Sequence, residues 1–375
     1  MRSDRLGVGV VGLHEGLTLL KALSYTVPDS VSQGAPGEPT RSRYARAVAG
    51  CDLDPAKRER AERAVPGLKT TNDFAQMLAD PEVDIVAVYT PDSVHADQVE
   101  AAFAAGKAVI CTKPLVNRLE DARRILEAGR RHNGRLQVGQ STRFFPSFAR
   151  QRQDFDQGAI GDIEFVDAHY NHRMDWYYQK SPWAKTDTDW VFLGMSHPID
   201  LLAWYLGPIR EVSAYGTHSA LARSEGVRSF DIVTVQVVAE DGRIGRALGH
   251  YGLHELPRAR NAIECLLFGS AGTSLAQYHD MRYVRTAEDG VEVLEDHLYA
   301  KRGWAFNNEV HGMHYGEFAA YTDHFALAIL EGRPNSPNLE EGVATVCLME
   351  AVRRSAESGR PVEVGPLRRE VGLDF

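Results

Sequence analysis

Short apolar runs alternate with longer amphipathic segments in the first third of the chain. Each run is bounded by glycine, proline or polar residues, which predicts a buried strand of a parallel sheet. The runs are residues 8–11, 45–51, 84–89, 108–111 and 136–138. Residues 93–105 and 119–132 between them have helical periodicity. This alternation predicts an α/β domain with a doubly wound parallel sheet.

The pattern changes after Gly139 to apolar and polar residues that alternate one by one, as in strands with one covered face. Such segments predominate, with two helical segments among them, and they predict a second, α+β domain on a largely antiparallel sheet. The strands are expected near residues 163–169, 229–238 and 263–268, and the helices near 198–206 and 315–330. We place the domain boundary between residues 138 and 139, which gives domains of 1–138 and 139–375.

Residues 25–44 separate the first predicted helix from the second strand and are rich in proline, glycine and serine. This connection is longer than usual for such a domain. Loops from helix to strand lie at the sheet edge opposite the ligand. We therefore interpret the segment as a surface insertion.

The composition is that of a soluble globular protein, with 43% hydrophobic and 25% charged residues among 375. A formal net charge of -9 and scattered basic residues argue against general nucleic-acid binding. No apolar run reaches membrane-spanning length, so no membrane partner is expected. The N-terminal residues pass directly into a strand without a signal-peptide pattern, which predicts a cytoplasmic protein.

Cysteine and histidine spacing argues against a disulfide framework and a metal site. The four cysteines are far apart and form no C-x-x-C pair, so we expect reduced, mostly buried thiols. The closest histidine pairs are 169 and 172, 250 and 254, and 311 and 314. None has a cysteine, aspartate or glutamate at a recognisable ligand spacing, and no metal is predicted.

A literal G-x-G-x-x-G covers residues 7–12, but it overlaps the first strand, whereas nucleotide-binding glycines lie in the turn after that strand. The turn therefore begins at Gly12, and His14 occupies the position of the second glycine. Gly16 is expected to take the role of the third glycine of the motif, although it lies one residue before the usual position. The Cβ of His14 crowds a diphosphate without excluding it, because the turn can shift and the imidazole can donate a hydrogen bond.

Three polar residues after later strands are candidates for the same site. Asp52 ends the second strand, where an acid accepts hydrogen bonds from ribose hydroxyls and repels a 2'-phosphate. It favours NAD over NADP, and the alternative is a solvated turn acid. Thr90 and Pro91 end the third strand. Lys113 ends the fourth, next to a proline, and could reach a reacting oxygen beside a nicotinamide ring, although strand-end lysines are usually only solvated.

His197 precedes Pro198, which suits the first position of a helix. An imidazole at such a cap is a candidate general base, because its pKa lies near working pH. The alternative for His197 is a polar cap residue. Asp200 is more simply explained as a capping carboxylate.

Several segments in unbroken order resemble the Gfo/Idh/MocA oxidoreductase family, which includes glucose-fructose oxidoreductase and inositol dehydrogenase. The most specific is TPDSVHADQVEAAFAAGKAVICTKPL, and VGQSTRFFP, GAIGDIEFV, SHPIDLLAWYLG, LLFGSAGTSL and EGVATVCLMEAVRRSAESGRPVEV follow it. The resemblance implies an N-terminal Rossmann domain, a C-terminal domain with a large open mixed sheet, and a substrate pocket between them. It also implies hydride transfer between NAD(P) and a sugar, cyclitol or related polyol, and a homodimer or homotetramer formed through the sheet.

Carried over residue by residue, Lys113 matches the catalytic lysine of the family and His197 the histidine of its active-site helix. The expected cofactor contacts are Gly12, Leu13, His14, Asp52, Thr90, Pro91, His95, Lys113 and Gln140. The candidate substrate contacts are Tyr170, Trp183 and Asp189, and Trp176 and Tyr177 are further aromatics available to stack on a sugar.

Three departures from the family pattern leave alternatives open. Thr112 replaces the usual glutamate, His14 the second glycine, and Leu193 an aspartate four residues before the histidine. One alternative is a redox-neutral, NAD-assisted lyase or epimerase acting on a sugar-like substrate. The other is a catalytically inactive sensor with the same fold, which the retained Lys113 and His197 argue against.

Overall fold

The computed structural model describes residues 5–24, 42–255, 262–288, 290–297 and 316–373, which fall into two compact units. The first unit comprises the described residues within 1–115, 123–144 and 301–342. The second unit comprises those within 116–122, 145–300 and 343–375. The predicted insertion at 25–44 lies outside the described residues except for its last three.

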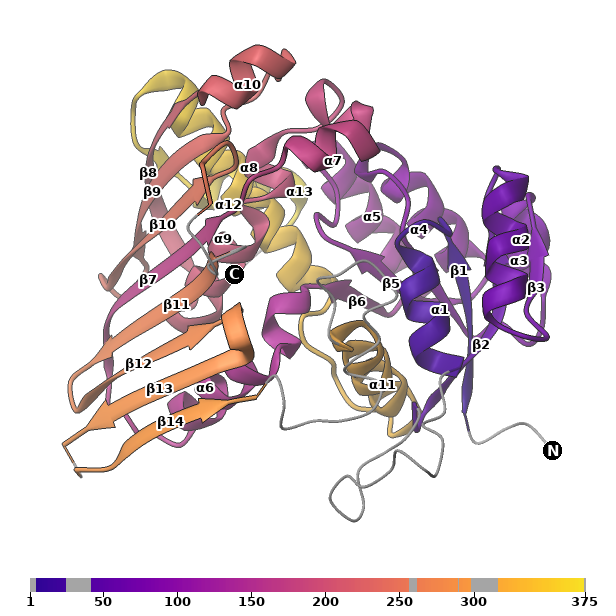
Figure 1. Cartoon of the computed structure of the whole chain (residues 1–375), viewed down its shortest axis with the longest axis horizontal. Coiled ribbons are helices and arrows are strands. Elements are labelled where there is room, and N and C mark those ends of the chain that lie inside the picture. The colour runs from indigo at the N-terminus through magenta and orange to yellow at the C-terminus, as the bar shows by residue number, and fades with distance from the viewer. Residues whose placement is uncertain (1–4, 25–41, 256–261, 289, 298–315, 374–375) are drawn as a thin grey trace. The chain divides into compact units, whose positions relative to one another are not determined.

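The first unit contains a six-stranded, all-parallel sheet in the order β3-β2-β1-β4-β5-β6 (Figure 1). This confirms the predicted doubly wound sheet, and β3 is a short addition to it. Because the strand order reverses between β1 and β4, the carboxyl ends of these neighbours flank a crevice of the kind that binds ligands. The strands are β1 (Leu6–Val11), β2 (Ala45–Cys51), β3 (Lys69–Thr71), β4 (Ile85–Val88), β5 (Ala108–Thr112) and β6 (Leu136–Gly139).

The helices of this unit include one from far along the chain. Helix α11 packs against α1, β2 and β6, and its Phe318, Tyr321 and Phe325 join the same hydrophobic core as Leu17 and Tyr89. A single boundary at residue 138 does not anticipate this return, because it divides the chain only once. The helices are α1 (Gly16–Ser24), α2 (Pro55–Ala64), α3 (Phe74–Ala79), η1 (Asp92–Val94), α4 (His95–Ala104), α5 (Leu119–His132), η2 (Ser141–Phe144) and α11 (Glu317–Leu330).

The second unit contains a nine-stranded sheet in the order β14-β13-β12-β11-β7-β10-β9-β8-β15. Only β7 and β10 pair in parallel; the other pairs are antiparallel, which confirms the expected mixed sheet. The strands are β7 (Ile163–Asn171), β8 (Ile209–Thr217), β9 (Ile232–Ala239), β10 (Ile244–His250), β11 (Ala262–Gly269), β12 (Gly272–Gln277), β13 (Arg282–Ala287), β14 (Glu292–Asp296) and β15 (Val362–Glu363).

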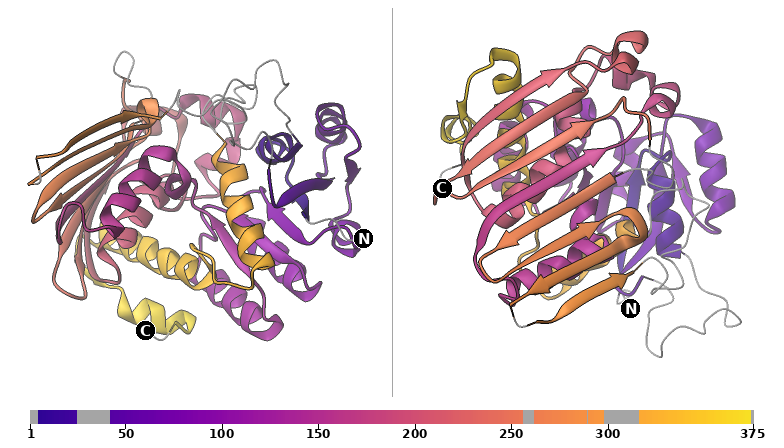
Figure 2. Two further views of the ribbon diagram at one scale, coloured as in Figure 1. Left: turned by 90° about the horizontal axis from the view of Figure 1, so that it is seen from below. Right: turned by 60° about the vertical axis from the view of Figure 1, so that its left-hand side comes forward.

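Helices α6 and α9 cover one face of this sheet, where they contact β7, β10, β11, β12 and β13. The other face is seen in Figure 2 (right), and no helix of the described part of this unit lies across it. The helices are α6 (Pro146–Asp156), α7 (Asp175–Lys180), η3 (Pro182–Lys185), α8 (Trp190–Leu193), α9 (Ser196–Leu206), α10 (Ala220–Glu225), η4 (His279–Met281), α12 (Leu339–Ser358) and α13 (Gly365–Val371).

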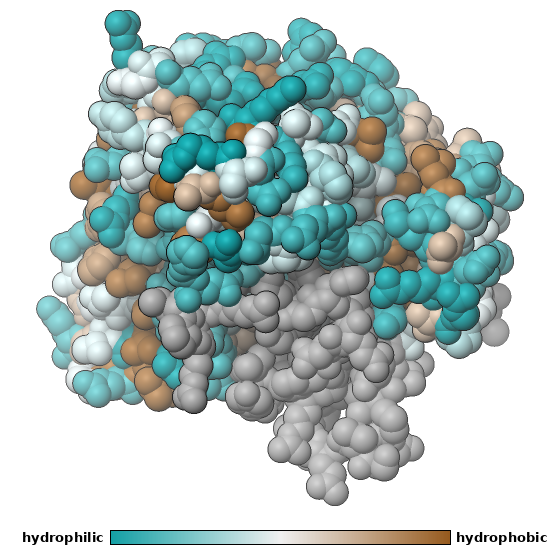
Figure 3. Space-filling view, turned by 45° about the horizontal axis from the view of Figure 1, so that its top comes forward, coloured by the Kyte–Doolittle hydropathy of each residue, from teal (hydrophilic) through white to brown (hydrophobic). Residues whose placement is uncertain are grey.

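Among the residues with described positions, no helix is long and apolar enough to cross a membrane. Hydrophilic residues cover most of the coloured surface in Figure 3, and the apolar residues there form small scattered groups.

Candidate active site

The turn between β1 and α1 approaches its neighbours too closely for side chains at two positions. Gly12 has a φ of +89°, and a Cβ there would lie 2.4 Å from the Tyr89 carbonyl oxygen. A Cβ on Gly16 would lie 2.4 Å from Cγ1 of Val10 in β1. These contacts confirm that the turn begins at Gly12, and they give Gly16 the third glycine's role of close helix-to-strand packing.

Asp52 follows β2 and binds the main chain of this turn. Its Oδ2 accepts a hydrogen bond from the Leu13 N–H at 2.8 Å, and its Oδ1 accepts one from the Asp54 N–H at 3.0 Å. The ammonium of Lys57 lies 3.7 Å from Oδ2. The carboxylate is therefore a fixed group that joins the ends of β1 and β2, and it is not a freely solvated turn acid.

The ring of His95, the first residue of α4, is buried among main-chain carbonyl groups. Its Nε2 lies 2.9 Å from the Thr90 oxygen, and its Nδ1 lies 3.1 Å from the oxygens of both Pro114 and Leu115. Both ring nitrogens are thus directed at the protein's own backbone, although sequence analysis assigned this residue to cofactor binding.

Lys113 is half-buried after β5, close enough to two carboxylates to be affected by their charge. Burial lowers the pKa of its ammonium to about 8, although Asp92 and Glu15 act in the opposite direction. Sequence analysis did not connect Glu15 with Lys113, because the two are almost one hundred residues apart. Their shared feature is that both follow a strand of the same parallel sheet.

Gln140 follows β6 and is 3% exposed. Its Oε1 is buried and has no hydrogen-bond partner among the described residues. A buried amide oxygen without a partner is costly unless something binds it. Together with the close turn at Gly12 and the fixed Asp52, this makes the carboxyl edge of the first sheet fit a dinucleotide cofactor.

Helix α9 begins at Ser196, two residues earlier than the expected start at Pro198. His197 therefore lies in the first turn of the helix. The imidazole is buried, and the ring of Tyr170 meets it edge to face at 5.3 Å between centroids. Tyr170 is the second-last residue of β7, and α9 packs against this strand. The second unit therefore joins a predicted catalytic residue with a predicted substrate contact.

An aromatic cluster continues from Tyr170. Tyr251 meets Tyr170 edge to face at 5.4 Å and stacks on Trp190 at 4.5 Å. Trp183 belongs to the same cluster through Tyr177, 6.3 Å away. Sequence analysis did not single out Tyr251 or Trp190. A possible signal was Gly194, where a Cβ would lie 2.3 Å from the Tyr251 ring.

Leu193, at the position of the family aspartate, is buried at the end of α8. Asp189 begins the same helix as its N-cap, with its carboxylate accepting the Val191 N–H at 2.8 Å. Burial raises the pKa of Asp189, although the Val191 N–H and Arg353 oppose this. The substrate role proposed for Asp189 stays a prediction.

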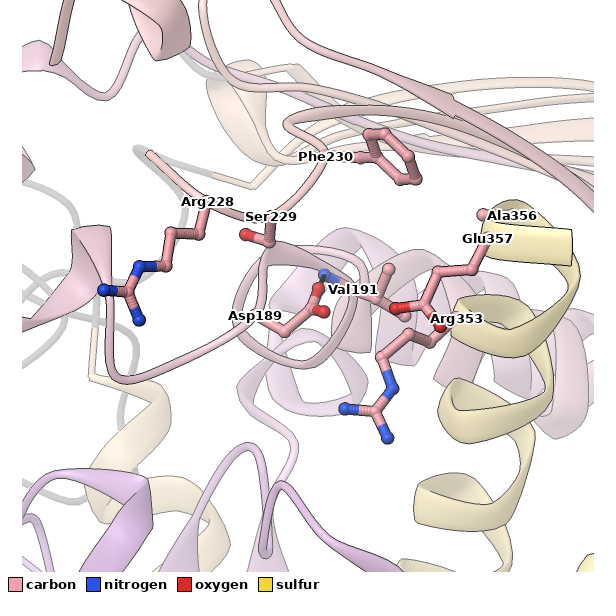
Figure 4. A pocket seen from close by; sticks show the side chains of 8 residues that line it. All are labelled: Asp189, Val191, Arg228, Ser229, Phe230, Arg353, Ala356 and Glu357. Atoms are coloured by element: carbon pink, nitrogen blue, oxygen red, sulfur yellow. Dashed lines mark hydrogen bonds between the residues drawn. The ribbon is translucent and has the colours of Figure 1, made fainter. Parts of the chain in front are cut away.

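Asp189 lines a small pocket of about 110 Å³ together with residues of α12 and of the loop before β9. Figure 4 shows the carboxylates of Asp189 and Glu357 directed toward each other, while the guanidinium groups of Arg228 and Arg353 extend away from them. Within the described ranges, no group of three or more His, Cys, Asp or Glu side chains could hold a metal ion.

Comparison with protein-family models gives two matches in succession. An oxidoreductase-family model for an NAD-binding Rossmann fold matches residues 6–140, and the model for that family's C-terminal alpha/beta domain matches residues 152–364. Among curated relatives, inositol 2-dehydrogenase 2 of Saccharopolyspora erythraea is 33% identical over 86% of this chain and 89% of its own length. Levoglucosan dehydrogenase of Pseudarthrobacter phenanthrenivorans is 25% identical over 96% and 98%.

Solved structures share the fold at lower identity. A levoglucosan dehydrogenase in complex with NADH and levoglucosan has a TM-score of 0.76 at 22% identity and covers 96% of this chain and 100% of its own. An oxidoreductase from Agrobacterium radiobacter in complex with NAD+, L-tartaric acid and magnesium has a TM-score of 0.77 at 20% identity and covers 97% and 99%.

Replacing Gly12 with alanine tests the close approach of the turn. Gly67 is a matched control, because its φ is +83° but a Cβ there would meet nothing within 4 Å. We expect Gly67→Ala to cost about 1–2 kcal/mol through backbone strain alone. Gly12→Ala should cost roughly 3 kcal/mol or more, because the Tyr89 carbonyl must also move. Urea unfolding monitored by circular dichroism measures both, and equal losses would contradict the close contact.

Proposed function

The chain belongs to the Gfo/Idh/MocA oxidoreductase family, and we propose on that premise that it is an NAD-dependent dehydrogenase or reductase. It transfers a hydride between the nicotinamide and a secondary alcohol or ketone of a sugar, cyclitol or related polyol. The observation that carries the proposal is the ordered match of both family domains over nearly the whole chain. Relatives with matching domains along most of their length are named inositol and levoglucosan dehydrogenases.

The cofactor is NAD, and the first sheet holds it at its carboxyl edge. Gly12, Leu13 and His14 would hold the diphosphate, and Asp52 would accept hydrogen bonds from the adenosine ribose. The Asp52 carboxylate would repel the 2'-phosphate of NADP. Its existing bond to the Leu13 N–H supports this role, because that bond holds the acid against the turn. The remaining contacts are Thr90, Pro91, Lys113 and Gln140.

In the reaction, the nicotinamide supplies the hydride acceptor or donor, and the protein handles the oxygen and its proton. Lys113 donates a hydrogen bond to the reacting oxygen, and its lowered pKa keeps the proton exchangeable near neutral pH. His197 takes up the hydroxyl proton during oxidation and returns it during reduction. The edge contact from Tyr170 orients the imidazole. Tyr170, Trp183 and Asp189 are the proposed substrate contacts.

Calorimetric titration with NAD and NADP in parallel tests the cofactor assignment. We expect the cofactor-stripped protein to bind NAD about tenfold or more tightly than NADP, because the 2'-phosphate meets the fixed Asp52 carboxylate. Asp52→Ser should weaken NAD binding and narrow this preference. Asp54→Ser is the matched control, since serine preserves the N-cap of α2 and Asp54 does not bind the turn.

Each other outcome of the titration has a defined meaning. Failure to bind either nucleotide would contradict the dehydrogenase and favour a catalytically inactive sensor with this fold. Nucleotide that leaves the protein only on denaturation, without net NADH formation on any polyol, would favour the redox-neutral lyase or epimerase.

Replacing Lys113 with methionine should abolish turnover but preserve the cofactor site. NADH formation on the best polyol of a screen should fall about 100-fold or more, while the dissociation constant of NAD stays within roughly threefold, a change of about 0.7 kcal/mol. Lys107 is the control at the opposite end of β5, where its Nζ donates to the carbonyls of Asp80 and Val83. Lys107→Met should retain turnover. Unchanged turnover in Lys113→Met would remove Lys113 from the mechanism.

We also propose that the protein is a homodimer or homotetramer that associates through the uncovered face of the second sheet. An apolar strip crosses three strands of this face, where Ile244 pairs with Phe165 and Phe165 pairs with Phe268. Ile244 and Phe268 are both exposed. Tyr215 and Leu294, further along the same sheet, are more exposed still. An uncovered sheet face with exposed aromatic and aliphatic side chains is typical of a subunit interface.

A charge within this strip should disrupt the association. Multi-angle light scattering after size exclusion should give a multiple of the chain mass for the wild-type protein and the mass of one chain for Phe268→Glu. Leu330→Glu is the control, because Leu330 is also exposed but ends α11 in the first unit. A monomeric wild-type protein, or an unaffected Phe268→Glu, would rule out this interface.

A cytoplasmic location completes the proposal. The four cysteines are free, buried thiols, which suits a reducing compartment.

A further inference from the structure

We infer that His95 is a buried imidazolium cation that positions the Lys113 turn, and that it is not a ligand of the cofactor. The geometry comes from the first unit alone. Only the expected effect on turnover rests on the proposed function.

Three backbone carbonyl groups surround the ring and determine its protonation. The Thr90 oxygen lies 2.9 Å from Nε2, and the Pro114 and Leu115 oxygens each lie 3.1 Å from Nδ1. Carbonyl oxygens only accept hydrogen bonds, and a neutral imidazole has one N–H donor. A neutral ring would therefore place one lone pair against a carbonyl oxygen. Both contacts are hydrogen bonds only when both nitrogens carry protons.

The surroundings favour the cation despite its burial. Only 1% of His95 is exposed, and burial by itself lowers the pKa of the imidazole. Cys111, the Thr90 carbonyl and the Asp92 carboxylate act in the other direction, and together they raise the pKa above its ordinary value. Asp92 is itself buried, three residues before the ring. The cation is thus solvated by protein dipoles and one carboxylate in place of water.

The three carbonyl groups belong to two separate connections of the sheet. Thr90 follows β4, and Pro114 and Leu115 follow the neighbouring strand β5. A second bond, from the Thr112 hydroxyl to the Val88 carbonyl at 3.0 Å, joins the same strand ends. Lys113 lies between Thr112 and Pro114, so both bonds hold its backbone against β4. His95 therefore acts on the reaction through Lys113, as a positioning residue.

Nitrogen chemical shifts of the histidine side chains test the protonation directly, without any substrate. In the wild-type full chain labelled with ¹⁵N-histidine, the signal absent from His95→Gln belongs to His95. We expect both of its nitrogens to remain protonated at pH 7.5, when an unperturbed imidazole is mostly neutral. A single neutral tautomer for His95 at that pH would overturn the inference. Should His95→Gln fail to fold, His95→Asn serves for the assignment.

The separation of turnover from cofactor affinity tests the positioning role. Glutamine donates through one end of its side chain only and cannot bridge both connections. His95→Gln should lower kcat on a polyol substrate by about 100-fold, the effect of displacing a catalytic group by about 1 Å. The dissociation constant of NAD should change by less than threefold, or about 0.7 kcal/mol. His132→Asn, at the exposed end of α5, should change neither value.

The other results of these measurements on His95→Gln and the wild-type protein lead to different conclusions. A loss of NAD affinity as large as the loss in kcat would make His95 a cofactor ligand and overturn the inference. Wild-type kcat in His95→Gln would also overturn it. A wild-type protein that forms no NADH on any polyol would contradict the proposed function, whereas the nitrogen shifts would still decide the protonation of His95.

Discussion

The hydrogen bond from the Leu13 N–H to Asp52 holds the turn after β1 against the end of β2, and the geometry of the nucleotide edge depends on it. On the other side of the turn, Gly12 lies against the Tyr89 carbonyl at the end of β4. The turn is therefore fixed from both neighbouring strands. The expectation that this turn can shift to accommodate His14 is therefore not supported, because the residues just before His14 are held from both sides.

In the second unit, the departure from the family pattern is Leu193, and an aromatic contact to His197 takes the place of the usual aspartate. Leu193 places an apolar, buried side chain where a carboxylate is usual, so no charge at that position orients His197. The edge of Tyr170 meets the imidazole instead, and Tyr170 is held in turn by Tyr251. An aromatic support of this kind fixes the ring's orientation without changing its charge. In the proposed reaction, His197 and Lys113 therefore handle the proton without a third charged residue at position 193.

The sequence was sufficient to predict the parallel sheet, the mixed character of the second sheet with three of its strands, the start of the turn at Gly12 and the position of Asp52, because each of these depends on local patterns of apolar residues and glycines. It predicted the helix near residues 315–330, which is α11, but it did not predict that this helix returns to the first core from more than 170 residues beyond β6. It also missed Tyr251 and Trp190, whose contact is made between a residue after β10 and a residue of α8. Contacts between residues far apart in the sequence depend on the order of the elements in the tertiary structure, and local patterns of apolar residues do not determine that order.

His95 illustrates the same limit at a single residue, since its motif alone suggested a cofactor contact, whereas three backbone carbonyl oxygens lie within hydrogen-bond distance of its ring. Its charge also affects the neighbourhood of Lys113. Two cations, His95 and Lys113, and two carboxylates, Asp92 and Glu15, interact at the ends of β1, β4 and β5. The opposite charges in this group lower the cost of burying its two buried members, His95 and Asp92. Lys113 can consequently be buried enough to lower its pKa and still remain an ammonium group at neutral pH, which is the form required by its proposed role as a donor to the reacting oxygen.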